Sequence, residues 1–382
     1  MKFILYFLSV TGLIYQTHTN FTFSSMNFLK RYGHPILLIL SIFSLNWFTA
    51  SPERVEFFYS RGFYPLLVSV SRTLLGWIPF SMGDLIYIII IVFCLYLSLK
   101  KIRGFLKSKN KLILFKSASK RLLLVFGWTW VAFQVLWGIN YSRPGIGTQF
   151  KLEESRLSTD DLHNLAILLV KETNRYAPGR KKGPYSHKEQ IKVIQQAYDS
   201  LGTKFVFLKY KNPSFKASLF GVIGNYMGYG GYYNPLSGEA QVNDRLPAFG
   251  LPYTCAHEVA HQLGFAKESE ANFIGYLAAL HSTDSSLLYS ANLDVFLYAN
   301  SALRRHDSTA ARLIFEQLSP IAKNDLKEYA KFIKKYQGPV DELTTQFYTQ
   351  FLHLNNQPEG MQSYSRVVGW VWRYMKNETA SL

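Results

Sequence analysis

The chain has 382 residues, which is enough for a membrane part and one sizeable further domain. Its hydrophobic content of 48% and aromatic content of 16% are high for a soluble enzyme, and its two cysteines exclude a disulfide-stapled scaffold. A formal net charge of +17 is typical of proteins that bind nucleic acid, but the distribution of the charge along the chain argues against that function.

The positive charge lies in the most apolar part of the chain. Residues 1–150 hold 16 Lys/Arg and 3 acidic residues, whereas residues 151–382 hold 26 and 22. Nine of the cations fall between Lys100 and Arg121, with no acid among them. Such a loop is typical of the cytoplasmic side of a membrane. We therefore expect membrane lipid as a partner and no nucleic acid.

Apolar segments between residues 34 and 141 predict a membrane domain with about three spans. The spans are expected over Pro35–Ala50, about Trp77–Leu99 and Leu122–Tyr141, with the basic loop at 100–121 before the third. The first span is short, so a helix buried on the membrane face remains an alternative. Five tryptophans suit lipid contact: Trp47, Trp77, Trp128, Trp130 and Trp137.

A further apolar run lies at residues 3–16. If it were a span, the basic loop would lie outside, against the positive-inside rule. We therefore interpret it as a signal-like leader or the product of an upstream start, and assign residues 1–33 to a leader and cytoplasmic N-terminus. This assignment places everything after Tyr141 outside the cytoplasm.

A linker rich in Pro and Gly, at residues 142–150, precedes the catalytic domain expected over 151–382. Helices are predicted first, strands and turns next, and mostly helices after Ser285. The predicted helices are Asp160–Tyr176, Ser186–Ser200 (which opens with a capping box), Asp325–Tyr336 and Val340–Leu354. Strands are predicted over Thr203–Tyr210 and Ala240–Asn243, and turns with short strands over Phe220–Tyr233.

The most informative motif is His257-Glu258-Val259-Ala260-His261, which reads H-E-x-x-H. Residues four apart lie on one face of a helix, so both imidazoles can reach a single metal ion. Glu258 is then placed to polarise a metal-bound water. Pro252 suits the start of such a helix, and Gly264 suits its end.

A second predicted helix, Ser269–His281, brings acids that can complete a three-ligand zinc site. Glu268 and Glu270 are two residues apart, roughly 200° around a helix, so both cannot face one metal ion. We favour Glu270, because it opens the apolar run Ala271, Ile274, Leu277 and Ala278. Glu268 remains the alternative ligand, or else a partner of a histidine or of the substrate.

Peptide hydrolysis also needs a donor to the oxyanion, and tyrosines are the candidates. They are Tyr232, Tyr233 and Tyr364. The stretch Tyr226–Tyr233 is a candidate edge strand for binding an extended peptide, with a turn-rich loop as the equal alternative. Cys255 could be a ligand or nucleophile, but a small buried residue at the helix start is the favoured interpretation.

The motif and the acidic segment behind it resemble the gluzincin class of zinc metallopeptidases. From about Pro35 to Met375 the chain is similar to an uncharacterised bacterial family of membrane-anchored H-E-x-x-H proteins. The matching segments are residues 59–62, 78–81, 231–235 and 238–243, together with the motif. The resemblance implies N-terminal transmembrane helices followed by an α+β, zincin-like metallopeptidase domain that is mostly helical after the motif.

We therefore expect a zinc metallopeptidase that acts on a peptide or protein. Zn²⁺ would be held by His257, His261 and Glu270 (or Glu268), with Glu258 as general base. The expected location is the bacterial inner membrane, with several spans and an extracytoplasmic catalytic domain. The alternative is a membrane-bound zinc-binding sensor or scaffold without turnover, although structural zinc needs no base such as Glu258.

Overall fold

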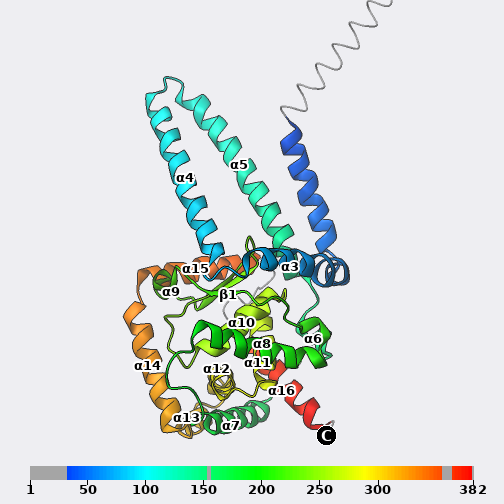
Figure 1. Ribbon diagram of the computed structural model, residues 1–382, viewed down its shortest axis with the longest axis vertical. Helices are drawn as coiled ribbons and strands as arrows, with labels where there is room; N and C mark the ends of the chain where they lie inside the picture. The colour runs from blue at the N-terminus through cyan, green and yellow to red at the C-terminus, as the bar shows by residue number, and fades with distance from the viewer. Residues whose placement is uncertain (1–31, 153–155, 355–363, 381–382) are drawn as a thin grey trace, which may run out of the picture. The chain divides into compact units, whose positions relative to one another are not determined.

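The computed structural model describes residues 32–152, 156–354 and 364–380 (Figure 1). Two compact units make up the chain. Unit 1 comprises the chain up to Ala50 and Leu97–Val135, and unit 2 comprises Ser51–Tyr96 and Leu136–Leu382. The predicted leader at residues 3–16 lies outside the described residues.

The described part of unit 1 consists of apolar helices, one of which begins in unit 2. They are a helix at Tyr32–Thr49, α4 (Met82–Lys107) and α5 (Lys111–Leu136). In the described ranges, α4 is the one single helix long and apolar enough to cross a membrane, with a mean hydropathy of 2.3. Tyr32–Thr49 and Pro52–Leu75 pass the same test as a pair bent by 97°.

The third predicted span, Leu122–Tyr141, extends too far at its C-terminal end. The helix ends at Leu136, and residues 138–142 form a 3₁₀ turn, η2. Trp137 and Tyr141 are buried in unit 2 instead of facing lipid. Trp137 packs between Tyr64 and Tyr233, at ring-centroid distances of 5.8 and 4.5 Å.

The segment before α4 packs on the C-terminal part of the chain, and this contact explains why it belongs to unit 2. It contains α2 (Pro52–Arg54), a π-helix η1 (Val55–Phe63) and α3 (Tyr64–Leu75). The Tyr64 hydroxyl donates to the carbonyl of Gln262, and Arg72 donates to the carbonyl of Lys211. Unit 2 therefore begins at Ser51, ahead of the predicted domain boundary at Tyr141.

Unit 2 is mostly helical and holds a small mixed sheet. Its strands are β1 (Phe215–Ala217), β2 (Gly231–Asn234) and β3 (Glu239–Val242), in the order β1-β3-β2. β1 is parallel to β3 with Phe215 opposite Ala240, and β2 is antiparallel to β3 with Gly231 opposite Val242. The predicted strand at Ala240–Asn243 is confirmed, and α9 (Gly221–Met227) precedes β2.

Buried carboxylates fix the start of α4 to this sheet. The Asp84 carboxylate accepts hydrogen bonds from the Tyr232 hydroxyl, from Ser218 Oγ at 3.1 Å and from the Leu219 amide at 2.7 Å. Glu239, the first residue of β3, accepts from the Gly83 amide at 2.8 Å. The apolar helix and the sheet are therefore held in one unit by charge-assisted hydrogen bonds.

The helices from Ile146 onward follow the predicted order. They are α6 (Ile146–Phe150), α7 (Thr159–Tyr176), α8 (His187–Lys204), α10 (Leu251–Gln262), α11 (Glu268–Leu280), α12 (Ser285–Arg304), α13 (Ser308–Glu316), α14 (Pro320–Tyr336), α15 (Pro339–Leu354) and α16 (Tyr364–Ala380). Ser186 forms the predicted capping box, and Ser158 forms one as well. The predicted strand at Thr203–Tyr210 is wrong: the segment ends α8 and forms the 3₁₀ turn η3 (Val206–Leu208).

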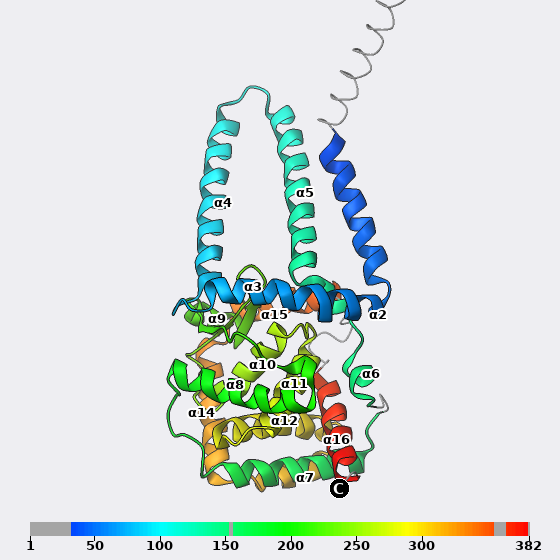
Figure 2. The ribbon, with the colours of Figure 1, turned by 45° about the vertical axis from the view of Figure 1, so that its right-hand side comes forward.

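The core of unit 2 surrounds α11. This helix packs against α8, α10, α12 and α16 (Figure 2). Residues 269–279 are buried on every side of it, so α11 lacks the polar face of a surface helix. A helix enclosed in this way holds the acid at its first turn in a fixed place relative to α10.

Candidate metal centre

The H-E-x-x-H motif lies on α10, and a short turn leads from it into α11. Pro252 occupies the first turn of α10, and Gly264 follows its end with a φ of +86°. This left-handed conformation favours glycine, and a Cβ there would also lie 3.1 Å from Asn140 Oδ1. The tight turn lets α11 fold back so that its first residue, Glu268, meets the motif.

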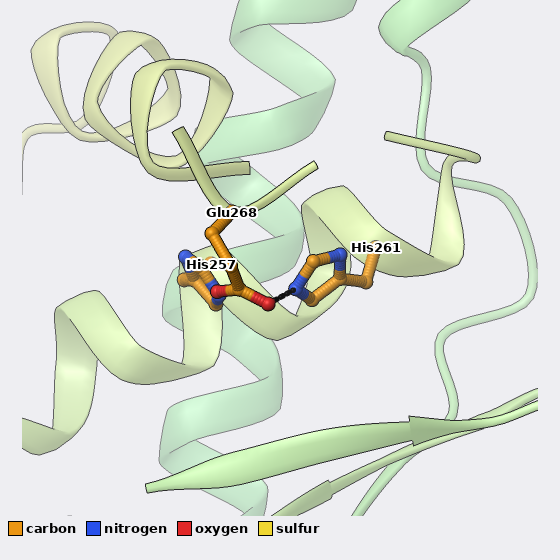
Figure 3. Close-up of side chains that lie close together, drawn as sticks. All are labelled: His257, His261 and Glu268. Atoms are coloured by element: carbon orange, nitrogen blue, oxygen red, sulfur yellow. Dashed lines mark ion pairs between the residues drawn. The ribbon is translucent and has the colours of Figure 1, made fainter. Parts of the chain in front are cut away.

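Three side chains converge at this junction (Figure 3). His257 Nε2 lies 3.3 Å from Glu268 Oε2, and His261 Nε2 lies 3.6 Å from Glu268 Oε1. The three potential ligand atoms all lie within 4.8 Å of one another. Two imidazoles and one carboxylate form the donor set of many catalytic zinc sites, so the residues fit a metal ion.

The outer nitrogens of both imidazoles have hydrogen-bond partners that orient the rings. His261 Nδ1 lies 2.7 Å from the carbonyl of Phe265, an acceptor only, so Nδ1 carries the proton and the lone pair is on Nε2. His257 Nδ1 lies 2.7 Å from Asn272 Oδ1, where Nδ1 is the donor. Partners of this kind fix the tautomer of metal-binding histidines.

The structure favours the alternative third ligand over the preferred one. Glu268, the alternative, lies with the histidines, whereas the Glu270 carboxylate faces Lys267 Nζ at 3.5 Å and is buried. Asn272 and Gly275 explain the orientation, since with Glu268 they form an i, i+4, i+7 stripe against α10. A Cβ at Gly275 would lie 3.1 Å from the His257 amide nitrogen, so the helices are in close contact there.

Glu258 lies beside the histidines and is 4% exposed. Within the described residues, its Oε2 has no hydrogen-bond partner. Burial raises the pKa of Glu258 to about 7, although the nearby His257 and His261 act in the opposite direction. A buried carboxylate with an unused oxygen next to a metal-ligand cluster can accept a proton from a water molecule.

The charges of the cluster attract a cation. Burial alone would raise the pKa of Glu268, but hydrogen bonds and charges from both histidines hold it well below its usual range. Burial likewise lowers the pKa of His257, but Glu268 and Glu258 raise it to about 9. The carboxylates thus draw positive charge to the point where the three ligand atoms meet, and a metal ion supplies the same charge.

Two tyrosines that the sequence did not single out lie at the site. The Tyr348 hydroxyl, from α15, donates to Glu268 Oε1. Tyr141 is buried; its pKa is raised mainly by burial and also by the negative charge of Glu268. Both pack against Phe351, at ring distances of 6.2 Å. They come from segments far from the motif, so no local spacing could have indicated them.

Two of the predicted oxyanion donors make contacts with other residues, and the side chain of the third is not among the described ones. Tyr232 is bonded to Asp84 at the start of α4, and the Tyr233 ring packs on Trp137, which lies between it and His261. Tyr364 begins α16, but its side chain is outside the described part of the chain. Cys255 is fully buried, as expected for a packing residue, and burial raises its thiol pKa.

Comparison with known families gave one match. The model of a family described as "Protein of unknown function (DUF3810)" matches residues 59–372, which include all of the site. Comparison with curated proteins and with solved structures gave no significant match.

Proposed function

The chain belongs to the DUF3810 family of unknown function, and we propose from its site that it is a membrane-anchored zinc metallopeptidase. The observation that carries the proposal is the convergence of His257, His261 and Glu268 next to the buried carboxylate of Glu258. Two histidines with a carboxylate are zinc ligands in known peptidases, and a neighbouring glutamate suits the general base.

The residues of the chain divide the chemistry between them. Zn²⁺ held by His257, His261 and Glu268 would acidify a water molecule and polarise the scissile carbonyl. Glu258 takes the proton from the attacking water at its carboxylate and passes it to the leaving amine nitrogen. Asn272 and the carbonyl of Phe265 keep both imidazoles in the orientation that presents Nε2.

An extended peptide has a place to bind beside Glu258. β2 is an edge strand of the described sheet, and its residues Gly231–Tyr233 are half-buried. A strand edge offers main-chain hydrogen bonds to a peptide of any sequence. Because Gly231 lies against Glu258, a peptide paired with β2 would pass the proposed base.

Glu258 also distinguishes turnover from mere zinc binding. A sensor or scaffold needs the three ligands but gains nothing from a buried carboxylate whose Oε2 lacks a hydrogen-bond partner among the described residues. Such an oxygen costs free energy unless a substrate or water uses it. Hydrolysis is therefore the better-supported function.

The location is part of the proposal. α4 anchors the chain in the bacterial inner membrane, together with the helix at Tyr32–Thr49 and α5 as further spans. The nine cations at residues 100–121 favour the cytoplasm for the turn between α4 and α5. Unit 2 then faces the extracytoplasmic side, where the substrate would be a peptide or protein of the cell envelope.

The test compares cells that carry the wild-type chain, Glu258→Gln, or Glu316→Gln as a surface control. New protein N-termini are collected and identified by mass spectrometry. We expect a set of termini that appears with the wild type and the control and is absent with Glu258→Gln. Identical sets of termini in all three strains would reject the peptidase proposal.

A further inference from the structure

Unit 2 has an apolar surface at the end from which α4 leaves. In both ribbon views, α3, α9 and α15 lie at this end, and α7 lies at the opposite end (Figures 1 and 2). The exposed apolar residues here, called the apolar end face, are Leu66, Val70, Leu74, Trp77, Phe80, Val222, Ile223, Val340, Leu343 and Phe347. A soluble monomer rarely exposes so many large apolar side chains together.

The outer stripe of α3 is apolar where a surface helix would be polar. Tyr64, Val68 and Arg72, spaced four apart, are buried against unit 2. Two positions along, Leu66, Val70 and Leu74 form a second stripe, with Leu66 69% exposed. Two positions correspond to roughly 200° around a helix, so the second stripe points away from the protein. An outward stripe without polar residues needs an apolar neighbour.

α15 carries another exposed apolar stripe at this end. Asp341, Thr344 and Tyr348 are the more buried stripe, and Tyr348 bonds to Glu268 of the metal cluster. Val340, Leu343 and Phe347 form the exposed stripe, with Phe347 64% exposed. Glu342, Thr345 and Gln346 are exposed on the adjoining side of the helix. An exposed apolar stripe with a polar stripe beside it suits a helix that lies in the membrane–water interface.

The path of the chain identifies the neighbour. Trp77 and Phe80 of the apolar end face are followed at Met82 by α4, the membrane-length helix, whose first residues belong to unit 2. Trp77 is 79% exposed, and its indole N–H donates to the carbonyl of Leu74. Tryptophan is enriched at the membrane–water interface, which is where a spanning helix must begin.

We propose that the apolar end face rests in the headgroup and outer acyl region of the bilayer that α4 crosses. Unit 2 then lies on the membrane surface instead of extending away from it on a tether. α15 takes part in both regions: its Tyr348 bonds to Glu268 of the metal cluster, and its Phe347, about 100° further around the helix, belongs to the apolar end face. The proposal shares α4 with the proposed function but does not depend on hydrolysis.

The test uses the full chain in lipid vesicles, with Cys94→Ala as background because Cys255 is buried and unreactive. A fluorophore is attached at Leu66→Cys, Val222→Cys or Phe347→Cys. The matched control is Leu313→Cys: Leu313 is 50% exposed, on α13, which packs against α7 at the opposite end of unit 2. Val70→Cys replaces Leu66→Cys if that variant does not elute as a single folded species.

Quenching by lipids with a nitroxide on the upper acyl chain gives the readout. We expect the three face labels to lose about half their fluorescence, because interfacial helices lie roughly 5–10 Å into the acyl boundary. The Leu313→Cys label should be unchanged by lipid nitroxide and quenched by aqueous iodide. Face labels open to iodide and unaffected by lipid would overturn the proposal. Protection from both quenchers would also overturn it, because a protein or a second copy would then cover the face.

Discussion

The carboxylate of Glu258 lies directly against the backbone of Gly231, the first residue of β2. A Cβ on Gly231 would lie 2.6 Å from Glu258 Oε1 and 2.8 Å from the carbonyl oxygen of Gln241. The carbonyl belongs to β3 and cannot move without disturbing the sheet. Only glycine therefore allows β2 to pass this close to the proposed base.

We expect Gly231→Ala to lower peptidase activity by roughly 10²-fold, because a shift of about 1 Å in a catalytic group has that effect. Zinc content should remain at the wild-type level, since no metal ligand lies on β2. Cleavage of a substrate identified by N-terminal mass spectrometry gives the activity. Gly183→Ala is the control, as its Cβ would meet nothing within 4 Å. Full activity in Gly231→Ala would remove β2 from the active site.

Asn272 orients His257, so its removal should weaken metal binding without removing a ligand. We expect Asn272→Ala to raise the dissociation constant for zinc about 10–100-fold, as is usual for the hydrogen-bond partners of ligands. Competition with a chromophoric chelator measures the constant. Asn292→Ala serves as the comparison, because Asn292 is buried in the same core but bonds to Tyr276. Equal affinities in the two variants would show that Asn272 does not act through His257.

A buried ion pair supports the turn between the two helices of the site. Arg143 is 3% exposed; it donates to both oxygens of Glu56 at 2.9 Å and to the carbonyl of Gly264 at 2.9 Å. Glu56→Ala leaves the guanidinium buried and unpaired, so we expect a loss of roughly 3–5 kcal/mol in the free energy of unfolding. The exposed pair Arg312–Glu316 is the control, and Glu316→Ala should cost less than about 1 kcal/mol.

The same pair should make stability depend on acid pH. Burial alone would raise the pKa of Glu56, but Arg143 and Arg61 hold it below its ordinary value of 4.5 in the folded state. A carboxyl group whose pKa is lower in the folded than in the unfolded state stabilises the protein at pH values above its unfolded pKa. This stabilisation is lost as the pH falls through the folded pKa. The stability difference between wild type and Glu56→Ala, measured by denaturant unfolding, should therefore shrink below about pH 4.5. A difference that stays constant down to pH 2 would contradict this.

The orientation in the membrane has its own test. A reporter that is active only in the cytosol should be active when fused near Lys109 and silent when fused after Tyr141. The reason is the basic turn between α4 and α5, set against the nearly balanced charge of residues 151–382. The reverse pattern would place the metal centre in the cytoplasm and contradict the proposed location.

Local signals in the sequence predicted the elements well where short-range chemistry decides them. The capping box at Ser186 predicted the start of α8, and the helical spacing of the motif predicted one face for His257 and His261. The alternating residue pattern of Thr203–Tyr210 led to the wrong prediction of a strand. α8 continues to Lys204 and leaves too few residues for one.

The third ligand shows why the rest could not be predicted. The apolar run after Glu270 implied a buried side, but α11 is buried all round, so that run carried no directional information. Asn272 and Gly275 mark the side that meets α10, a signal that depends on knowing which helix packs there. Tyr348 and Trp137 approach the site from distant segments, and only tertiary structure brings them together.

The metal content of two purified variants, Glu268→Ala and Glu270→Ala, tests the account most directly. Both lose a carboxylate from the same turn of α11, but only Glu268 lies between the imidazoles. Elemental analysis of the folded, detergent-solubilised chain should find zinc in the wild type and in Glu270→Ala, and lose it in Glu268→Ala. Zinc retained in Glu268→Ala but lost in Glu270→Ala, or no bound metal in the wild type, would contradict the proposed centre.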